Sequence, residues 1–106
     1  MAKDELILNQ LSSLAKKMFP HGEGEVFLYG SRANGSAKRT SDWDILILTD
    51  DARSTSDDFA SFALPFAEIG WKFGEQITPI HYTRGQWAAE SKSAFYQSVI
   101  SSYKRL

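Results

Sequence analysis

Cysteine is absent from this chain, and so are a strong charge of either sign and any long hydrophobic run. Without cysteine, neither disulfides nor thiolate metal sites can form. The 12 basic and 13 acidic side chains leave a formal net charge of −1, so bulk charge gives no reason to expect nucleic acid or an anionic membrane as a partner. No apolar stretch approaches the roughly 20 residues of a membrane span. The first residues are charged and unlike a signal peptide, so we expect an intracellular, cytoplasmic protein.

What the chain does contain is ample material for a core. Hydrophobic residues make up 42% of the sequence and aromatic residues 13%, which is not the composition of a disordered chain. A length of 106 residues fits one small domain. No repeat, low-complexity tract or linker divides it. We therefore expect a single domain over residues 1–106.

Hydrophobic periodicity predicts helices that alternate with strands. Apolar residues three and four apart are typical of one face of a helix, and short apolar runs are typical of buried strands. The predicted elements are a helix over 4–18, a strand over 25–29, a short helix, a strand over 43–48, a helix over 56–73, a strand over 76–82, and helical segments within 86–106 that divide near 91–93, with Phe95, Val99, Tyr103 and Leu106 on one face. This order predicts the α/β fold class.

Two prolines and one apolar run refine this picture. Pro65 lies inside the helix predicted over 56–73, so we expect a kink or a break there. Pro79 cannot donate a hydrogen bond to a strand ladder, which favours an edge strand or a bulge. The run of aliphatic residues over 45–48 indicates a central strand covered on both faces.

The turn after the first predicted strand is a candidate phosphate site. Gly30 and Ser31, here called the Gly-Ser turn, leave a strand and open a helix-capable segment. Backbone N–H groups at such a helix start, together with the serine hydroxyl, can bind a phosphate. Arg32 lies in the first turn that follows and is the expected triphosphate contact. Taken alone, the pair also fits an ordinary turn at a strand end.

Two carboxylates begin the second predicted strand. Asp42 and Asp44 are two residues apart, so their side chains point to one face and can share a metal ion. Asp44 adjoins four consecutive aliphatic residues, where an unpaired carboxylate is costly, and two close carboxylates repel. A divalent cation between them removes both costs. A solvated strand start is the alternative interpretation.

The spacing of these residues resembles a known signature. Gly30 and Ser31, ten intervening residues, and then Asp42 and Asp44 are similar to the Gly-Ser-x10-Asp-x-Asp pattern of the DNA polymerase beta-like nucleotidyltransferase superfamily. The surrounding segments, residues 27–35 and 41–47, resemble that family too. In length the chain resembles its minimal, MNT-type members, which are often paired with HEPN-domain proteins in toxin–antitoxin modules.

The resemblance implies a nucleotidyltransferase core, with a small mixed sheet packed with helices. Gly30 and Ser31 would hold the β- and γ-phosphates of a nucleoside triphosphate, and Asp42 and Asp44 would bind Mg²⁺. An acceptor hydroxyl would attack the α-phosphorus and displace pyrophosphate. The expected function is therefore Mg²⁺-dependent transfer of AMP from ATP to a hydroxyl. In some minimal members the acceptor is a tyrosine of the HEPN partner.

One departure from the family pattern keeps a second function open. Active members carry a third carboxylate on the next strand, where this chain has Thr78, and threonine is neither a charged ligand nor a base at neutral pH. Strand alternation places Glu75 and His81 on the opposite face from Thr78. The alternatives are therefore a catalytically weak or inactive nucleotide-binding, antitoxin-like module that acts by binding a partner, and a structural α/β module with a chance motif. Nucleic acid is not an expected substrate, and the oligomeric state is open.

Overall fold

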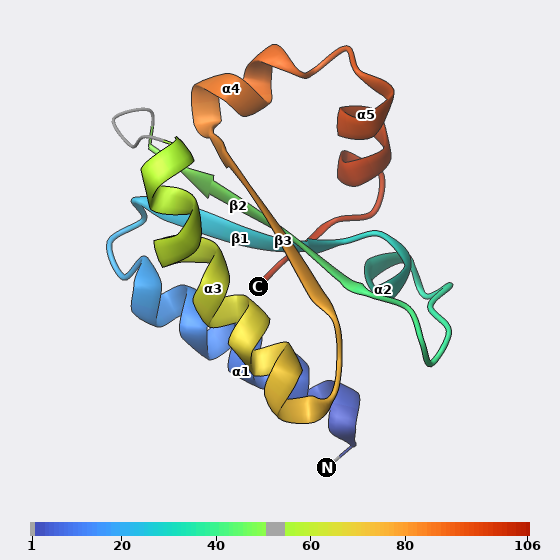
Figure 1. Cartoon of the computed structure of the whole chain (residues 1–106). Coiled ribbons are helices and arrows are strands. Elements are labelled where there is room, and N and C mark those ends of the chain that lie inside the picture. The colour runs from blue at the N-terminus through green and yellow to red at the C-terminus, as the bar shows by residue number, and fades with distance from the viewer. Residues whose placement is uncertain (1, 51–54) are drawn as a thin grey trace.

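The arrangement of helices and strands follows the predicted order. The computed structural model describes residues 2–50 and 55–106, with side chains except those of residues 55–59. Within these residues the chain forms α1 (Lys3–Met18), β1 (Gly24–Tyr29), α2 (Ser31–Asn34), β2 (Trp43–Thr49), α3 (Thr55–Phe73), β3 (Ile77–Thr83), α4 (Arg84–Ala89), α5 (Ala94–Ile100) and β4 (Lys104–Arg105) (Figure 1).

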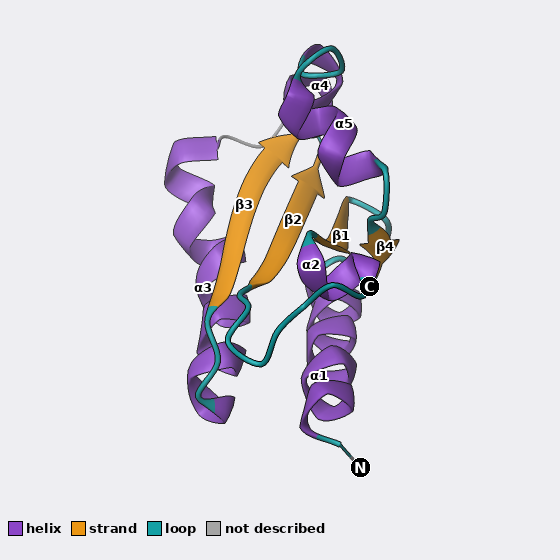
Figure 2. Cartoon of the chain, turned by 90° about the vertical axis from the view of Figure 1, so that its right-hand side faces the viewer, coloured by secondary structure: helices purple, strands orange, loops and turns teal. Residues whose placement is uncertain are grey.

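The strands of the described residues form one sheet in the order β3-β2-β1-β4. β1 pairs antiparallel with both β2 and β4, whereas β2 and β3 run parallel. Figure 2 shows the parallel pair, with α4 beyond the carboxyl end of β3. The predicted α/β class with a small mixed sheet packed with helices is confirmed.

Strand alternation gives the sheet two hydrophobic layers. One face packs against α1 and α3, which lie side by side (Figure 1). Its strand residues are Val26, Leu28, Trp43, Ile45, Ile47 and Ile77. The other face presents Phe27, Leu46 and Leu48 to Trp87 of α4 and Val99 of α5. β2 is therefore covered on both sides over most of its length, which confirms the predicted central strand.

The two prolines have different outcomes. α3 contains Pro65 and is a single helix from Thr55 to Phe73, so the break offered as one outcome did not occur. Phe62 and Phe66 are buried on either side of the proline, and their burial offsets a backbone penalty of about 3 kcal/mol. Pro79 lies on the edge strand β3, as predicted, and pairs one to one with Ile45.

The backbone nitrogen of Pro79, which carries no hydrogen, faces away from β2. The Trp43 N–H donates to the Gln76 carbonyl at 2.9 Å. In a parallel ladder, alternate residues of a strand direct their backbone groups to the same neighbour. Gln76 and Thr78 therefore bond toward β2, and the backbone of Pro79 faces the free edge, where no ladder N–H is needed.

The end of the chain corrects the sequence prediction. The helical face predicted to run from Phe95 to Leu106 ends early, because α5 stops at Ile100 and β4 follows. The Leu106 N–H donates to the Val26 carbonyl at 2.9 Å, and Tyr103 stacks on Phe27 with ring centroids 4.7 Å apart. The backbone groups on this edge of β1 need partners, and the last residues supply them. The predicted division near residues 91–93 is confirmed, since α4 ends at Ala89 and α5 begins at Ala94.

Some predictions concern residues outside the described part. The start of the helix predicted over 56–73 is among them, since the side chains of residues 55–59 lie outside the described part. Among the helices that the structure describes, none has the length and apolar character needed to cross a membrane.

Candidate functional site

The Gly-Ser turn has a backbone that requires glycine. β1 ends at Tyr29, and Gly30 has φ 74° and ψ −155°, a combination essentially restricted to glycine. The N–H groups of Ala33 and Asn34 donate to the Gly30 carbonyl at 3.0 and 3.1 Å, which closes the one-turn helix α2. The N–H groups of Ser31 and Arg32 precede these bonds, so they are the ones this geometry offers to a ligand.

The turn lies directly against Asp44. A Cβ atom built on Gly30 would collide with Oδ2 of Asp44, so the absence of a side chain is what lets the carboxylate approach. Pairing of β1 with β2 places Tyr29 opposite Asp44 and fixes this contact. The structure therefore brings together two of the predicted site residues, Gly30 and Asp44.

A row of three side chains crosses the sheet at this point. Tyr29 on β1, Asp44 on β2 and Thr78 on β3 are in register, and residues in register share a face. Asp42, just before β2, is exposed, and its negative charge acts on Asp44. Burial first, and the charge of Asp42 second, raise the pKa of Asp44. The two predicted carboxylates therefore lie close enough to interact.

This donor set fits Mg²⁺ bound together with a phosphate. Asp42 and Asp44 supply carboxylate oxygens, and an ionised Asp44 is penalised by burial and by its neighbour, both of which a cation relieves. Among the described residues there is no group of three or more His, Asp or Glu side chains that could hold a metal alone. Thr78 occupies the position beside Asp44. Mg²⁺ commonly uses one or two carboxylates plus substrate phosphates, so the substrate would complete its coordination.

Tyr29 is a site residue that sequence reasoning did not identify. Burial, then the charge of Asp44, then Tyr82 raise the pKa of Tyr29 to about 12. Its hydroxyl therefore keeps its proton at neutral pH and can only donate toward an anion. The ring is held edge-on by Phe95, with centroids 5.9 Å apart. An antiparallel pairing of the strands before and after the motif would have predicted that Tyr29 faces Asp44.

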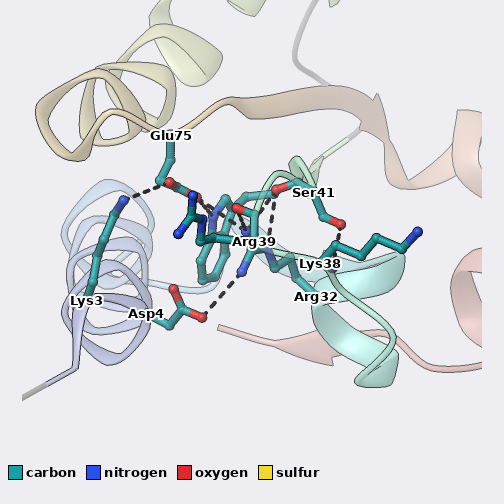
Figure 3. Close-up of polar contacts among 8 residues, drawn as sticks. Lys3, Asp4, Arg32, Lys38, Arg39, Ser41 and Glu75 are labelled. Carbon is teal, nitrogen blue, oxygen red and sulfur yellow. Dashed lines mark hydrogen bonds and ion pairs between the residues drawn. The ribbon is translucent and has the colours of Figure 1, made fainter.

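Arg32, in contrast, points to the other side of the sheet. Its guanidinium carbon lies 4.5 Å from the centre of the Trp43 ring, and its side chain is only 8% exposed. It donates to the Ser41 carbonyl at 3.0 Å and pairs with Glu75 at 3.3 Å (Figure 3). Trp43 is buried under the sheet. The position of Arg32 thus gives no support to the expected triphosphate contact.

Neither candidate substitute for the third carboxylate reaches the row. Glu75 accepts hydrogen bonds from the Lys3 ammonium at 2.8 Å and from Trp43 Nε1 at 3.1 Å, on the α1 side. The Lys3 hydrogen bond, followed by that of Trp43, lowers the pKa of Glu75. Nε2 of His81 lies 2.7 Å from Oγ1 of Thr49, and the ring packs edge-on against Phe62 of α3. Both residues lie on the face opposite Thr78.

Comparison with known proteins agrees with this geometry. Residues 8–90 match the nucleotidyltransferase domain family. The chain belongs to that family. The match extends from α1 past the end of α4 and includes the Gly-Ser turn and both carboxylates. Nucleotidyl transfer from a nucleoside triphosphate is the general activity of such a domain. No curated protein and no solved structure matches the chain.

Replacing Gly30 should be more harmful than replacing Gly35. Both have positive φ. Gly35 lies in the left-handed helical region, where alanine costs about 1–2 kcal/mol, whereas the φ and ψ of Gly30 are essentially closed to any other residue. A Cβ on Gly30 also displaces Asp44, whereas one on Gly35 meets nothing within 4 Å. Urea denaturation should therefore show a larger loss of unfolding free energy for Gly30→Ala than for Gly35→Ala. Equal losses would mean that the close contact with Asp44 contributes nothing.

Asp44→Asn should stabilise the folded protein at pH 7. The pKa of Asp44 is raised in the fold, so its ionised form costs stability above that pKa, and the cost disappears as the pH falls through it. The urea midpoint of the variant should exceed that of the wild type at pH 7, and the difference should shrink toward about pH 4. An asparagine variant less stable than the wild type at pH 7 would contradict an energetically unfavourable carboxylate.

Proposed function

We propose that this chain is a Mg²⁺-dependent nucleotidyltransferase that transfers AMP from ATP to a hydroxyl group. The observation that carries the proposal is the direct contact of the Gly-Ser turn with Asp44. A phosphate-binding backbone and an energetically penalised carboxylate meet at one point, and a metal-bound triphosphate satisfies both. The family match supplies the class of reaction.

Each group then has a defined role. Backbone N–H groups of the Gly-Ser turn and the hydroxyl of Ser31 would bind the β- and γ-phosphates. Asp42 and Asp44 would hold Mg²⁺, which when bound neutralises the phosphate charge. The acceptor hydroxyl would give its proton to a base that comes with the acceptor while its oxygen attacks the α-phosphorus; the bond to the bridging oxygen of the β-phosphate would break, and pyrophosphate would leave with the electron pair. The protonated Tyr29 hydroxyl can donate to a phosphate oxygen beside Asp44.

The acceptor is proposed to be a hydroxyl on another protein. Asp42 is exposed, so an acceptor can approach the carboxylates from solvent. Resemblance to minimal nucleotidyltransferases favours a HEPN-type partner in a cytoplasmic toxin–antitoxin module, where the transferred AMP would silence the partner.

A second function is favoured by Thr78. A threonine in register with Asp44 cannot take the proton of the acceptor hydroxyl at neutral pH. The alternative is a nucleotide-binding, antitoxin-like module that acts by binding its partner without efficient transfer. Both functions require metal-dependent nucleotide binding, and they differ in the release of pyrophosphate.

Calorimetric titration of ATP, with and without Mg²⁺, tests the shared site. We expect saturable binding that strengthens with Mg²⁺ in the wild type. Asp42→Asn and Asp44→Asn should remove the metal-dependent part, because each deletes a charged ligand. Asp50→Asn, the same substitution just beyond the other end of β2, is the matched control and should bind like the wild type. Binding that ignores both Mg²⁺ and the carboxylates would refute the site.

Thr78→Asp separates an impaired enzyme from a binding module. An aspartate here lies beside Asp44 and restores a charged ligand and proton acceptor. We expect pyrophosphate release in the presence of the acceptor protein to rise by roughly 100-fold, the lower end of general-base effects. Thr78→Asn, equal in size but uncharged, should give no gain. If Thr78→Asp binds ATP and Mg²⁺ yet releases no more pyrophosphate than the wild type, the binding module is favoured.

A further inference from the structure

The segment that delivers Asp42 is held from behind the sheet. Arg32 leaves α2 directly after the Gly-Ser turn and passes to the α1 side. Its Nη2 donates to the Ser41 carbonyl at 3.0 Å and to the Arg39 carbonyl at 3.3 Å, and its Nε also donates to Ser41. The planar guanidinium thus holds the carbonyl of Ser41, directly before Asp42, and that of Arg39, two residues earlier (Figure 3).

Glu75 holds the residue on the other side of Asp42. Oε1 of Glu75 accepts from Nε1 of Trp43 at 3.1 Å and from Arg32 at 3.3 Å. The guanidinium of Arg32 also stacks on the Trp43 ring. Ser41 and Trp43, the two neighbours of Asp42, are therefore both fixed by the same ion pair.

We propose that Arg32 and Glu75 form a positioning pair that sets Asp42 beside Asp44. Among the described residues, the side-chain hydrogen bonds and ion pairs of Arg32 and Glu75 join them to each other and to Lys3, Asp4, Arg39, Ser41 and Trp43, and none reaches Asp42 or Asp44. The pair acts through the backbone of Ser41 and the ring of Trp43, from the face opposite the chemistry. Its effect on metal binding rests on the proposed function, whereas its effect on the backbone around Asp42 does not.

Burial indicates that this pair matters more than its neighbours. The side chains of Arg32 and Glu75 are 8% and 13% exposed, whereas their α1 partners Asp4 and Lys3 are 61% and 52% exposed. Exposed ion pairs contribute little. The contact between Arg32 and Glu75 is part-buried, so removing one member leaves the charge of the other less well compensated.

The alternative role for Arg32 predicts the opposite result. If Arg32 bound the triphosphate directly, loss of Glu75 would release its guanidinium and strengthen ATP binding. If Arg32 and Glu75 position Asp42, loss of either weakens metal-dependent binding. The sign of the Glu75→Gln effect therefore decides between the two roles.

Two measurements on the full chain test the pair. Hydrogen exchange of the Ser41 and Trp43 amides, which donate to the Lys38 and Gln76 carbonyls, reports the backbone around Asp42 without any ligand. We expect exchange about tenfold faster in Glu75→Gln. ATP titration at varied Mg²⁺ should show a roughly tenfold loss of apparent Mg²⁺ affinity, with metal-free ATP binding unchanged.

Two further variants sharpen the test. Arg32→Lys keeps the charge but not the planar fork, so it should behave like Glu75→Gln; a phosphate-binding role would let lysine rescue much of the ATP affinity. Trp43→Phe keeps an aromatic face for Arg32 but deletes the Nε1 donor and part of the buried ring, so it should change both measurements in the same direction. Glu25→Gln is the matched control, because Glu25, like Glu75, pairs with two basic side chains: Arg84 at 3.2 Å and Arg105 at 3.5 Å, in another part of the sheet. It should leave the Ser41 and Trp43 amides unchanged.

The outcomes separate the two proposals. If the wild-type protein shows no Mg²⁺-dependent binding of ATP, the proposed function is refuted. Hydrogen exchange alone then tests whether Arg32 and Glu75 position the backbone around Asp42. Unchanged exchange at Ser41 and Trp43 in Glu75→Gln, or tighter ATP binding, overturns the positioning role. Faster exchange of the Ser41 and Trp43 amides in Glu75→Gln, with unchanged exchange in Glu25→Gln, supports the positioning role.

Discussion

The pairing of β1 with β2 is the constraint on which the site depends. This pairing sets Tyr29 opposite Asp44 and so carries the following glycine against the carboxylate. A shift by one residue would turn Asp44 toward α1 and α3 and expose Trp43 on the other face. Both strands are buried on both sides through most of their length, so hydrophobic alternation alone specifies the register weakly. Contacts at the start of β2 disfavour other registers. Trp43 donates to Glu75 on one face, and Asp44 contacts Gly30 on the other.

β2 therefore contains both strongly stabilising side chains and one that is energetically unfavourable. Ile45 and Ile47 are fully buried in the layer against α1 and α3, and Leu46 is fully buried in the layer against α4 and α5. In contrast, the surroundings of Asp44, one residue earlier, disfavour its charge. Burial of three aliphatic side chains, worth about 1.5–3 kcal/mol each, lets the strand tolerate an unfavourable carboxylate at its end. Binding sites commonly carry such a local cost, which a ligand of opposite charge removes.

The parts of the fold that could be predicted are those with a local signal. The apolar stripe of α1 and the aliphatic run of β2 follow from periodicity, and the Gly-Ser turn and the two carboxylates follow from residue type and spacing. β4 could not be found in this way, since two residues have no periodicity and their strand exists only because β1 offers an edge. The direction of Arg32 depends on Glu75, 43 residues away in sequence. One clue was available, because strand alternation places Trp43 on the face opposite Asp44, and a cation so near in sequence could stack on its ring from that side.

The position of Thr78 constrains how a transfer reaction could run. Thr78 is in register with Asp44, and β3 contains no acidic residue that could take its place. Nearby residues cannot replace the missing carboxylate. The pKa of Tyr29 is raised to about 12, so its hydroxyl stays protonated at neutral pH. Glu75 and His81 contact groups on the opposite face of the sheet. Asp42 or Asp44 could accept the proton only by giving up a metal ligand. Under the proposed function, the base must therefore come with the acceptor. A site with an exposed Asp42 and no base of its own is suited to a reaction completed by a second protein, and on its own it would be limited to binding the nucleotide.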